Sequence, residues 1–171
     1  MVDPYTQNLL DEFACRRLIE KYWWTESRRD AAGLTALFTE DGRWGAAVGR
    51  DAITAQADGF FAMMRPIAEN PTSFGGVNIE VDGDEAAGFV HGIAHLVLPQ
   101  SDGATKVVVV DATYDVRFRR EQGEWRISSL VGPGDPNIPH GASFQFEARG
   151  TAIDFGMPAE SEHNAGDVVA G

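Results

Sequence analysis

Two histidines four residues apart, His91 and His95, lie in a segment whose pattern predicts a β-strand. Residues four apart on a strand point to the same face of it. Asp111 lies on the next predicted strand and could pair with one of the two histidines. A histidine oriented by a carboxylate is a general base. The alternative is that this face is the outer one, in a subunit interface. No third ligand stands at a recognisable spacing from the two histidines, so we predict no metal site.

Glu26 is a second candidate for acid–base chemistry. Residues 7–29 predict a helix, because apolar residues recur on one face of it up to Tyr22. Glu26 follows Tyr22 by four residues, which puts its carboxylate close to this apolar face. Either the carboxylate faces the interior, or the last turn frays and leaves Glu26 in water.

The elements that must position these residues follow in a simple order. Asp30 predicts the start of a second helix, with Leu34, Leu37 and Phe38 inside and its end at Gly42. A short strand and a third helix come next. Four strands in a meander follow, and the last two form a long hairpin with a turn at Gly123. This order is typical of an α+β fold with helices on one face of an antiparallel sheet. The remaining elements are predicted over 43–48, 49–65, 77–81, 86–98 and 106–132.

Length and charge limit the number of domains and the kinds of partner that the protein can have. The chain has 171 residues and a net charge of −12. We predict one domain over 1–157, in which 132–157 form a strap over the sheet, and a flexible tail over 158–171. The acidic balance disfavours nucleic acid or an anionic membrane as a partner. The sequence has no long apolar run and no signal-peptide pattern, so we expect a cytoplasmic protein.

Three segments, in order and spacing, resemble the SnoaL-like branch of the nuclear transport factor 2-like superfamily, nearest in pattern to scytalone dehydratase and lindane dehydrochlorinase. The segments are 22–42, 78–86 and 114–127. The resemblance implies a cone-like α+β barrel, with N-terminal helices packed on the concave face of a curved, mostly antiparallel sheet around one apolar pocket. It implies a cyclase, dehydratase or isomerase that needs no cofactor and acts on a hydrophobic cyclic or polyketide-like molecule. It also implies a homo-oligomer, a dimer or trimer.

The acid–base residues of the family are where this chain departs from it. By this resemblance, Ser27 and Phe74 stand where the dehydratase-type pair has its Asp and His. The steroid-isomerase pattern also lacks its carboxylate after Trp44. The alternative function is therefore a non-catalytic protein that binds a small molecule or forms an oligomer. If the chain is an enzyme, the catalytic candidates are Glu26, Tyr22 and His95. The candidates for substrate binding are Ser27, Trp44, Phe60, Phe74, Asn78 and Tyr114.

Overall fold

The computed structural model describes residues 2–65, 72–101, 103–132 and 144–150. It contains three helices and seven strands in these ranges. The helices are α1 (Pro4–Ser27), α2 (Ala31–Thr35) and α3 (Arg50–Met63). The strands are β1 (Phe38–Trp44), β2 (Ala47–Val48), β3 (Thr72–Asp82), β4 (Glu85–Pro99), β5 (Thr105–Glu121), β6 (Glu124–Val131) and β7 (Phe144–Gly150).

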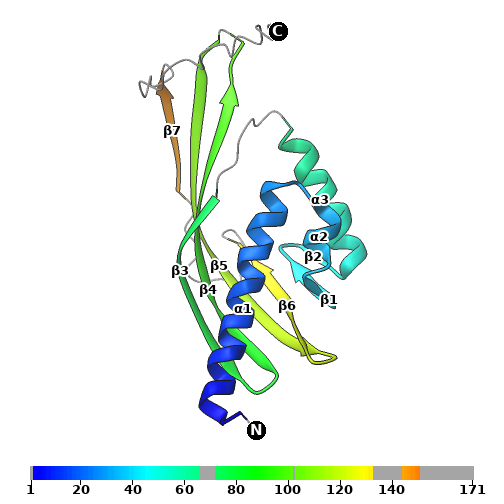
Figure 1. Cartoon of the computed structure of the whole chain (residues 1–171). Coiled ribbons are helices and arrows are strands. Elements are labelled where there is room, and N and C mark those ends of the chain that lie inside the picture. The colour runs from blue at the N-terminus through cyan, green and yellow to red at the C-terminus, as the bar shows by residue number, and fades with distance from the viewer. Residues whose placement is uncertain (1, 66–71, 102, 133–143, 151–171) are drawn as a thin grey trace, which may run out of the picture.

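The strands form one curved sheet that does not close on itself, and the helices lie on one side of it (Figure 1). Its order is β2-β1-β6-β5-β4-β3, and β7 pairs with β5 beyond the end of β6. All neighbours are antiparallel except β1 and β6, which are parallel. The predicted α+β class with N-terminal helices on a curved, mostly antiparallel sheet is confirmed. β7 lies within the predicted strap, whereas 133–143 and the predicted tail lie outside the described residues.

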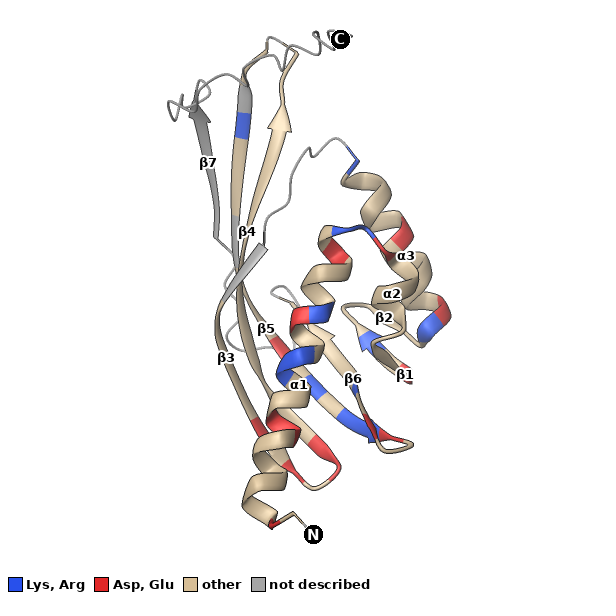
Figure 2. Ribbon diagram, in the orientation of Figure 1, with Lys and Arg blue, Asp and Glu red and all other residues tan. Residues whose placement is uncertain are grey.

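Charged side chains gather on the helices and on the half of the sheet that the helices cover (Figure 2). The part of the β4–β5 hairpin next to its turn, at the other end of the sheet, has few charged residues. Strand β4 carries no Lys, Arg, Asp or Glu after Glu85, and the Val-rich start of β5 carries Lys106 alone. Its described apolar side chains, such as Leu96 and Val108, are half-buried. No helix in the described part of the chain is long and apolar enough to span a membrane.

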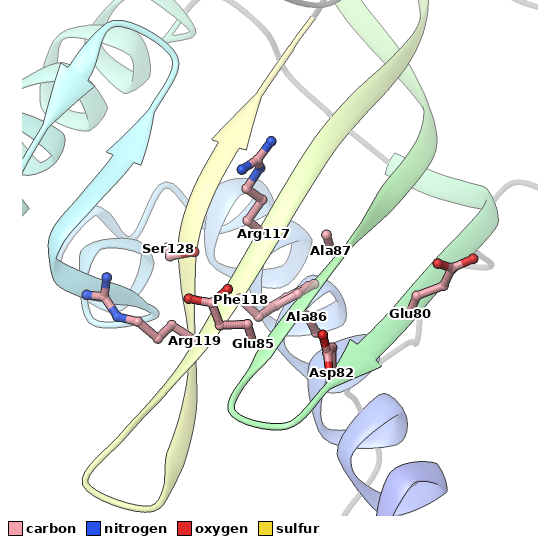
Figure 3. Close-up of a pocket in the computed structure, with 9 residues that line it drawn as sticks. All are labelled: Glu80, Asp82, Glu85, Ala86, Ala87, Arg117, Phe118, Arg119 and Ser128. Carbon is pink, nitrogen blue, oxygen red and sulfur yellow. The ribbon is translucent and has the colours of Figure 1, made fainter.

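The outer face of the sheet, away from the helices, has a hollow of about 390 Å3 near the β3–β4 turn (Figure 3). A register shift between Arg117 and Phe118 leaves Ser128 of β6 without a paired residue at this point. The hollow is lined by Glu80, Asp82, Glu85, Ala86, Ala87, Arg117, Phe118, Arg119 and Ser128. Glu26 is not among them.

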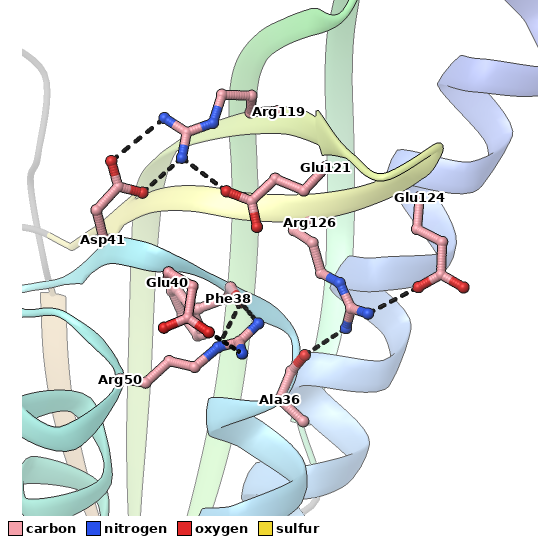
Figure 4. Close-up of polar contacts among 9 residues, drawn as sticks. All are labelled: Ala36, Phe38, Glu40, Asp41, Arg50, Arg119, Glu121, Glu124 and Arg126. Carbon is pink, nitrogen blue, oxygen red and sulfur yellow. Dashed lines mark hydrogen bonds and ion pairs between the residues drawn. The ribbon is translucent and has the colours of Figure 1, made fainter.

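The second helix is much shorter than predicted. It ends at Thr35, and the next residues turn into β1, which pairs with β6. The main chain of Ile127 donates to the carbonyl of Leu37 at 2.9 Å, and Arg50 donates to the carbonyl of Phe38 at 2.8 and 3.1 Å. Figure 4 shows these arginine contacts and the neighbouring ones of Arg119 and Arg126. Partners distant in sequence therefore overrode the helical pattern, and the prediction for this segment was wrong.

The long hairpin and its turn agree with the prediction. Gln122 and Gly123 have φ values of 51° and 84°, as a tight two-residue hairpin turn requires. The first arm starts at Thr105, one residue before its predicted start. It is one uninterrupted strand, β5, of 17 residues. Its length lets β6 pair with one end and β7 with the other.

Candidate functional site

The carboxyl of Glu26 is buried at the end of α1, with 9% of the residue exposed. The helix keeps its form up to Ser27, so Glu26 stays on the face of α1 that already buries Tyr22 one turn earlier. The hydroxyl of Tyr22 donates a hydrogen bond to the Glu26 carboxylate. In turn, the indole nitrogen of Trp44 donates to the Tyr22 hydroxyl oxygen at 3.0 Å. Three side chains from α1 and β1 thus form one chain of hydrogen bonds that ends on a carboxyl group.

The environment brings the pKa of this carboxyl close to neutral pH. Burial raises the pKa of Glu26 to about 7, because the charged form loses its hydration, while the hydrogen bond from Tyr22 works in the opposite direction. Burial also raises the pKa of Tyr114 to about 12, and the negative charge of Glu26 adds to the effect. The pKa of Tyr22 is raised for the same two reasons. At neutral pH both tyrosines are hydrogen-bond donors, and Glu26 exists in both protonation states.

Aromatic rings pack against Tyr22, the neighbour of this carboxyl, and against one another. The ring of Trp23 lies edge-on to Tyr22, with centroids 4.9 Å apart, and edge-on to Tyr114 at 5.5 Å. Trp44 lies edge-on to Phe60 of α3 at 6.0 Å. We call this group the Glu26 site. It consists of Tyr22, Trp23, Glu26, Trp44, Phe60 and Tyr114.

Two glycines of the sheet let these rings approach its backbone. A Cβ atom at Gly92 would lie 3.0 Å from Cζ2 of Trp23, and one at Gly132 would lie 3.1 Å from Cε1 of Tyr114. Both distances are shorter than ordinary van der Waals contact. A larger residue at either position would therefore displace a ring of the Glu26 site.

Some of the predicted binding residues lie elsewhere. Ser27 is exposed, and its hydroxyl donates to the carbonyl of Trp24 at 2.9 Å. Asn78 is also exposed and alternates along β3 with the buried Ile79. The structure does not bring either residue to the Glu26 site. The side chain of Phe74 lies outside the described residues.

The histidines are on the other side of the sheet. Gly92 faces Trp23 of α1, so its neighbour His91, and His95 with it, point to the outer face. His95 is exposed and His91 is half-buried. Asp111 pairs through its backbone with Ile93, and its side chain is not described. Within the described ranges, no three His, Cys, Asp or Glu residues are placed to hold a metal ion.

Trp23 is the member of the site that the sequence did not single out as a site residue. Its helical spacing from Ile19 and Glu26 places it on the buried face of α1, but so many apolar residues share that face that nothing distinguishes it there. Its contacts with Tyr114 and Gly92 depend on strands that are distant in sequence. The pairing of Tyr22 with Glu26, by contrast, follows from spacing along one helix.

The sequence profile of the SnoaL-like domain matches residues 7–131. The chain belongs to this family. The match spans both α1, which carries Glu26, and β5, which carries Tyr114. Among curated proteins, none matches the chain.

Solved structures extend the similarity to the nuclear transport factor 2-like fold. A protein from Novosphingobium aromaticivorans assigned as a scytalone dehydratase has a TM-score of 0.66 and 18% identity over 86% of this chain and 95% of its own. A nuclear transport factor 2-like protein with a cystatin-like fold from the same species has a TM-score of 0.61 and 25% identity, over 75% and 84% of the two chains. A hexachlorocyclohexane dehydrochlorinase has a TM-score of 0.59 and 18% identity, over 87% and 97%. These similarities show that the chain has the nuclear transport factor 2-like fold.

Proposed function

We propose that this protein is a cofactor-independent cyclase, dehydratase or isomerase acting on a hydrophobic cyclic or polyketide-like molecule, with Glu26 as its general acid–base residue. One observation carries the proposal: a buried carboxyl with a pKa of about 7 among aromatic rings. A general acid–base group works best when its pKa is near the working pH. Buried carboxyls with strongly raised pKa values are also enriched at functional sites.

In this proposal the Glu26 carboxylate removes a proton from a carbon or hydroxyl of the substrate. The protonated carboxyl then returns a proton to another atom of the substrate or to a leaving hydroxyl. Tyr22 holds the carboxylate in place through its hydrogen bond and is itself held by Trp44. Trp44, Phe60 and Tyr114 provide apolar surface, which would contribute roughly 25 cal/mol for each Å2 of apolar area buried. Glu26 thus takes over the task of the missing Asp–His pair.

The test is a comparison of the wild-type protein with Glu26→Gln, which keeps the shape and removes the proton exchange. Both proteins are incubated in D2O with a panel of cyclic β-hydroxy ketones and polyketide-like aromatic ketones. Deuterium uptake next to the carbonyl and loss of water are followed by NMR and mass spectrometry. We expect the wild type to accelerate one of these reactions, with a pH profile that inflects near 7. Glu26→Gln should be at least about 100-fold slower, because general acid–base catalysis contributes at least about that factor.

The second candidate function is binding without chemistry. The replacement of the Asp–His pair by Ser27 and Phe74 favours it. In that case the wild type and Glu26→Gln would both bind members of the panel, and neither would exchange deuterium or release water. This outcome would contradict the catalytic proposal.

We also propose that the protein assembles as a homo-oligomer. The half-buried apolar arm of the β4–β5 hairpin and the exposed Phe89 on the outer face support this. Light scattering coupled to size-exclusion chromatography measures the mass directly. A purely monomeric species at micromolar concentration would contradict this part of the proposal.

A further inference from the structure

The indole nitrogen of Trp23 is a buried donor with no acceptor in the part of the chain that the structure describes. No described residue lies within hydrogen-bonding distance of it, although the residue is only 7% exposed. A buried donor left unpaired loses its hydrogen bonds to water without a replacement, so proteins rarely keep one without a reason.

The other three tryptophans show that the chain otherwise satisfies this group. Trp44 donates to the Tyr22 hydroxyl at 3.0 Å, and Trp125 donates to the Asp11 carboxylate at 2.9 Å. Trp24 is 63% exposed and can donate to water. Trp23 alone of the four indole groups has neither a described partner nor open solvent.

The position of this donor connects it with Glu26. Trp23 and Glu26 are three residues apart on α1, so their side chains leave the helix on the same face, with Cβ atoms roughly 5–6 Å apart. Cζ2 of Trp23 faces Gly92, and the indole nitrogen lies on the same edge of the ring system as Cζ2. The donor therefore lies between α1 and the sheet, within the group of rings of the Glu26 site.

We infer that the N–H group of Trp23 binds an acceptor oxygen of the small molecule that occupies the Glu26 site. The ligand is thus an oxygenated, flat apolar molecule, with a carbonyl or similar oxygen on Trp23 and the neighbouring carbon toward Glu26. This inference rests on the proposed function. When Glu26 takes the proton from that carbon, the electron pair of the C–H bond forms a C=C bond and the carbonyl electrons move to the oxygen. The N–H group of Trp23 then donates to an oxygen with growing negative charge.

The experiment uses two probes of the same shape, acetophenone and ethylbenzene, which differ in the carbonyl oxygen. Both are titrated into the full chain carrying 15N-labelled tryptophan, and the four indole N–H signals are followed by NMR. Trp23→Phe identifies the Trp23 signal. We expect acetophenone to move this signal downfield, as a new hydrogen bond does, and ethylbenzene to leave it near its starting position. The second probe separates the hydrogen bond from ring-current effects that both probes share.

Affinity provides the second readout. We expect Trp23→Phe to weaken acetophenone binding about 5- to 30-fold, the equivalent of one hydrogen bond, and to leave ethylbenzene binding within about twofold. Trp24→Phe, a change of an exposed indole on the same helix, should leave both affinities unchanged.

Two further outcomes would overturn the inference. In the first, both probes bind, move the Trp23 signal alike and lose equal affinity in Trp23→Phe. The carbonyl oxygen then does not bind to Trp23, and the proposed function stands without this inference. If neither probe binds to the wild type, the small-molecule site itself is contradicted, and the inference fails with it.

Discussion

Helix α1 buries two carboxylates, Asp11 and Glu26, and treats them in opposite ways. They are fifteen residues apart, which corresponds to about 22 Å along a helix. Asp11 is 6% exposed and Glu26 is 9% exposed. The two residues are similarly exposed, but the carboxyl of Glu26 lies deeper in the protein, and one pKa is below and the other well above the ordinary value of a carboxyl group.

The depth of burial and the number of donors together explain the difference between the two pKa values. Burial alone would raise the pKa of Asp11, but hydrogen bonds from Trp125, Arg120 and Gln7, with the positive charge of Arg120, outweigh it and lower that pKa. The three donors lie 2.9, 2.7 and 3.2 Å from one carboxylate oxygen. Glu26 receives a hydrogen bond from Tyr22 and has no cation among the causes of its shift. Asp11, which joins elements together, is surrounded by donors, whereas Glu26, the proposed acid–base residue, has fewer.

The largest expected effects are changes in the free energy of unfolding, which should fall in Asp11→Ala and rise in Glu26→Gln. Asp11→Ala leaves the indole N–H of Trp125 buried without its acceptor and removes one partner of Arg120. We expect it to lower the free energy of unfolding by about 3 kcal/mol, measured by urea denaturation at pH 7. Asp11→Asn, which keeps an acceptor for Trp125, should lose less. Equal losses in both variants would mean that the indole bond contributes little.

Glu26→Gln should act in the other direction. At pH 8 most of the Glu26 carboxyl is ionised in a buried place, which costs folding free energy that a neutral amide avoids. A pKa of about 7 against 4.5 for an ordinary carboxyl corresponds to about 3 kcal/mol, and we expect Glu26→Gln to gain up to about that amount at pH 8. A loss of stability at pH 8 would contradict the strong desolvation of Glu26.

The pH dependence of the wild type should show both carboxylates. Glu26 binds its proton more tightly in the folded state, so its contribution is complete below about pH 4.5 and is lost as the pH rises to about 7. Asp11 binds its proton less tightly in the folded state, so its contribution is present above about pH 3.8 and is lost as the pH falls further. Urea denaturation at a series of pH values should therefore place the greatest stability on the acidic side of neutrality. Glu26→Gln should flatten the decline between pH 4.5 and 7, and an unchanged decline would assign it to other groups.

How much of this contrast the sequence reveals depends on the distance between partners. Tyr22 and Glu26 are one helical turn apart, so the spacing alone places the carboxyl near the apolar face, and the structure buries it there. Two of the three donors of Asp11, Trp125 and Arg120, are more than a hundred residues away, and no local pattern connects them with it. The same reason explains why the start of β1 at Phe38 was missed, since its main partner, β6, is distant in sequence. The meander of β3 to β6, which depends on short turns between neighbouring strands, was predicted in the right order.

The smallest expected effect concerns the one hydrogen bond that Glu26 does receive. Tyr22→Phe removes the O–H donor and keeps the ring, so the pKa of Glu26 should rise further above 7, by one unit or less. It also leaves the indole N–H of Trp44 without its acceptor, which should lower the free energy of unfolding by about 1 kcal/mol. A 13C-NMR titration of the Glu26 carboxyl measures the pKa directly, and Trp44→Phe is the matched control, because it removes the second bond of the chain and keeps the first. A pKa that falls in Tyr22→Phe would mean that water enters and hydrates the carboxylate. The dry environment of Glu26 would then depend on Tyr22 more than on the fold around it, and the contrast with Asp11 would rest on one phenol ring.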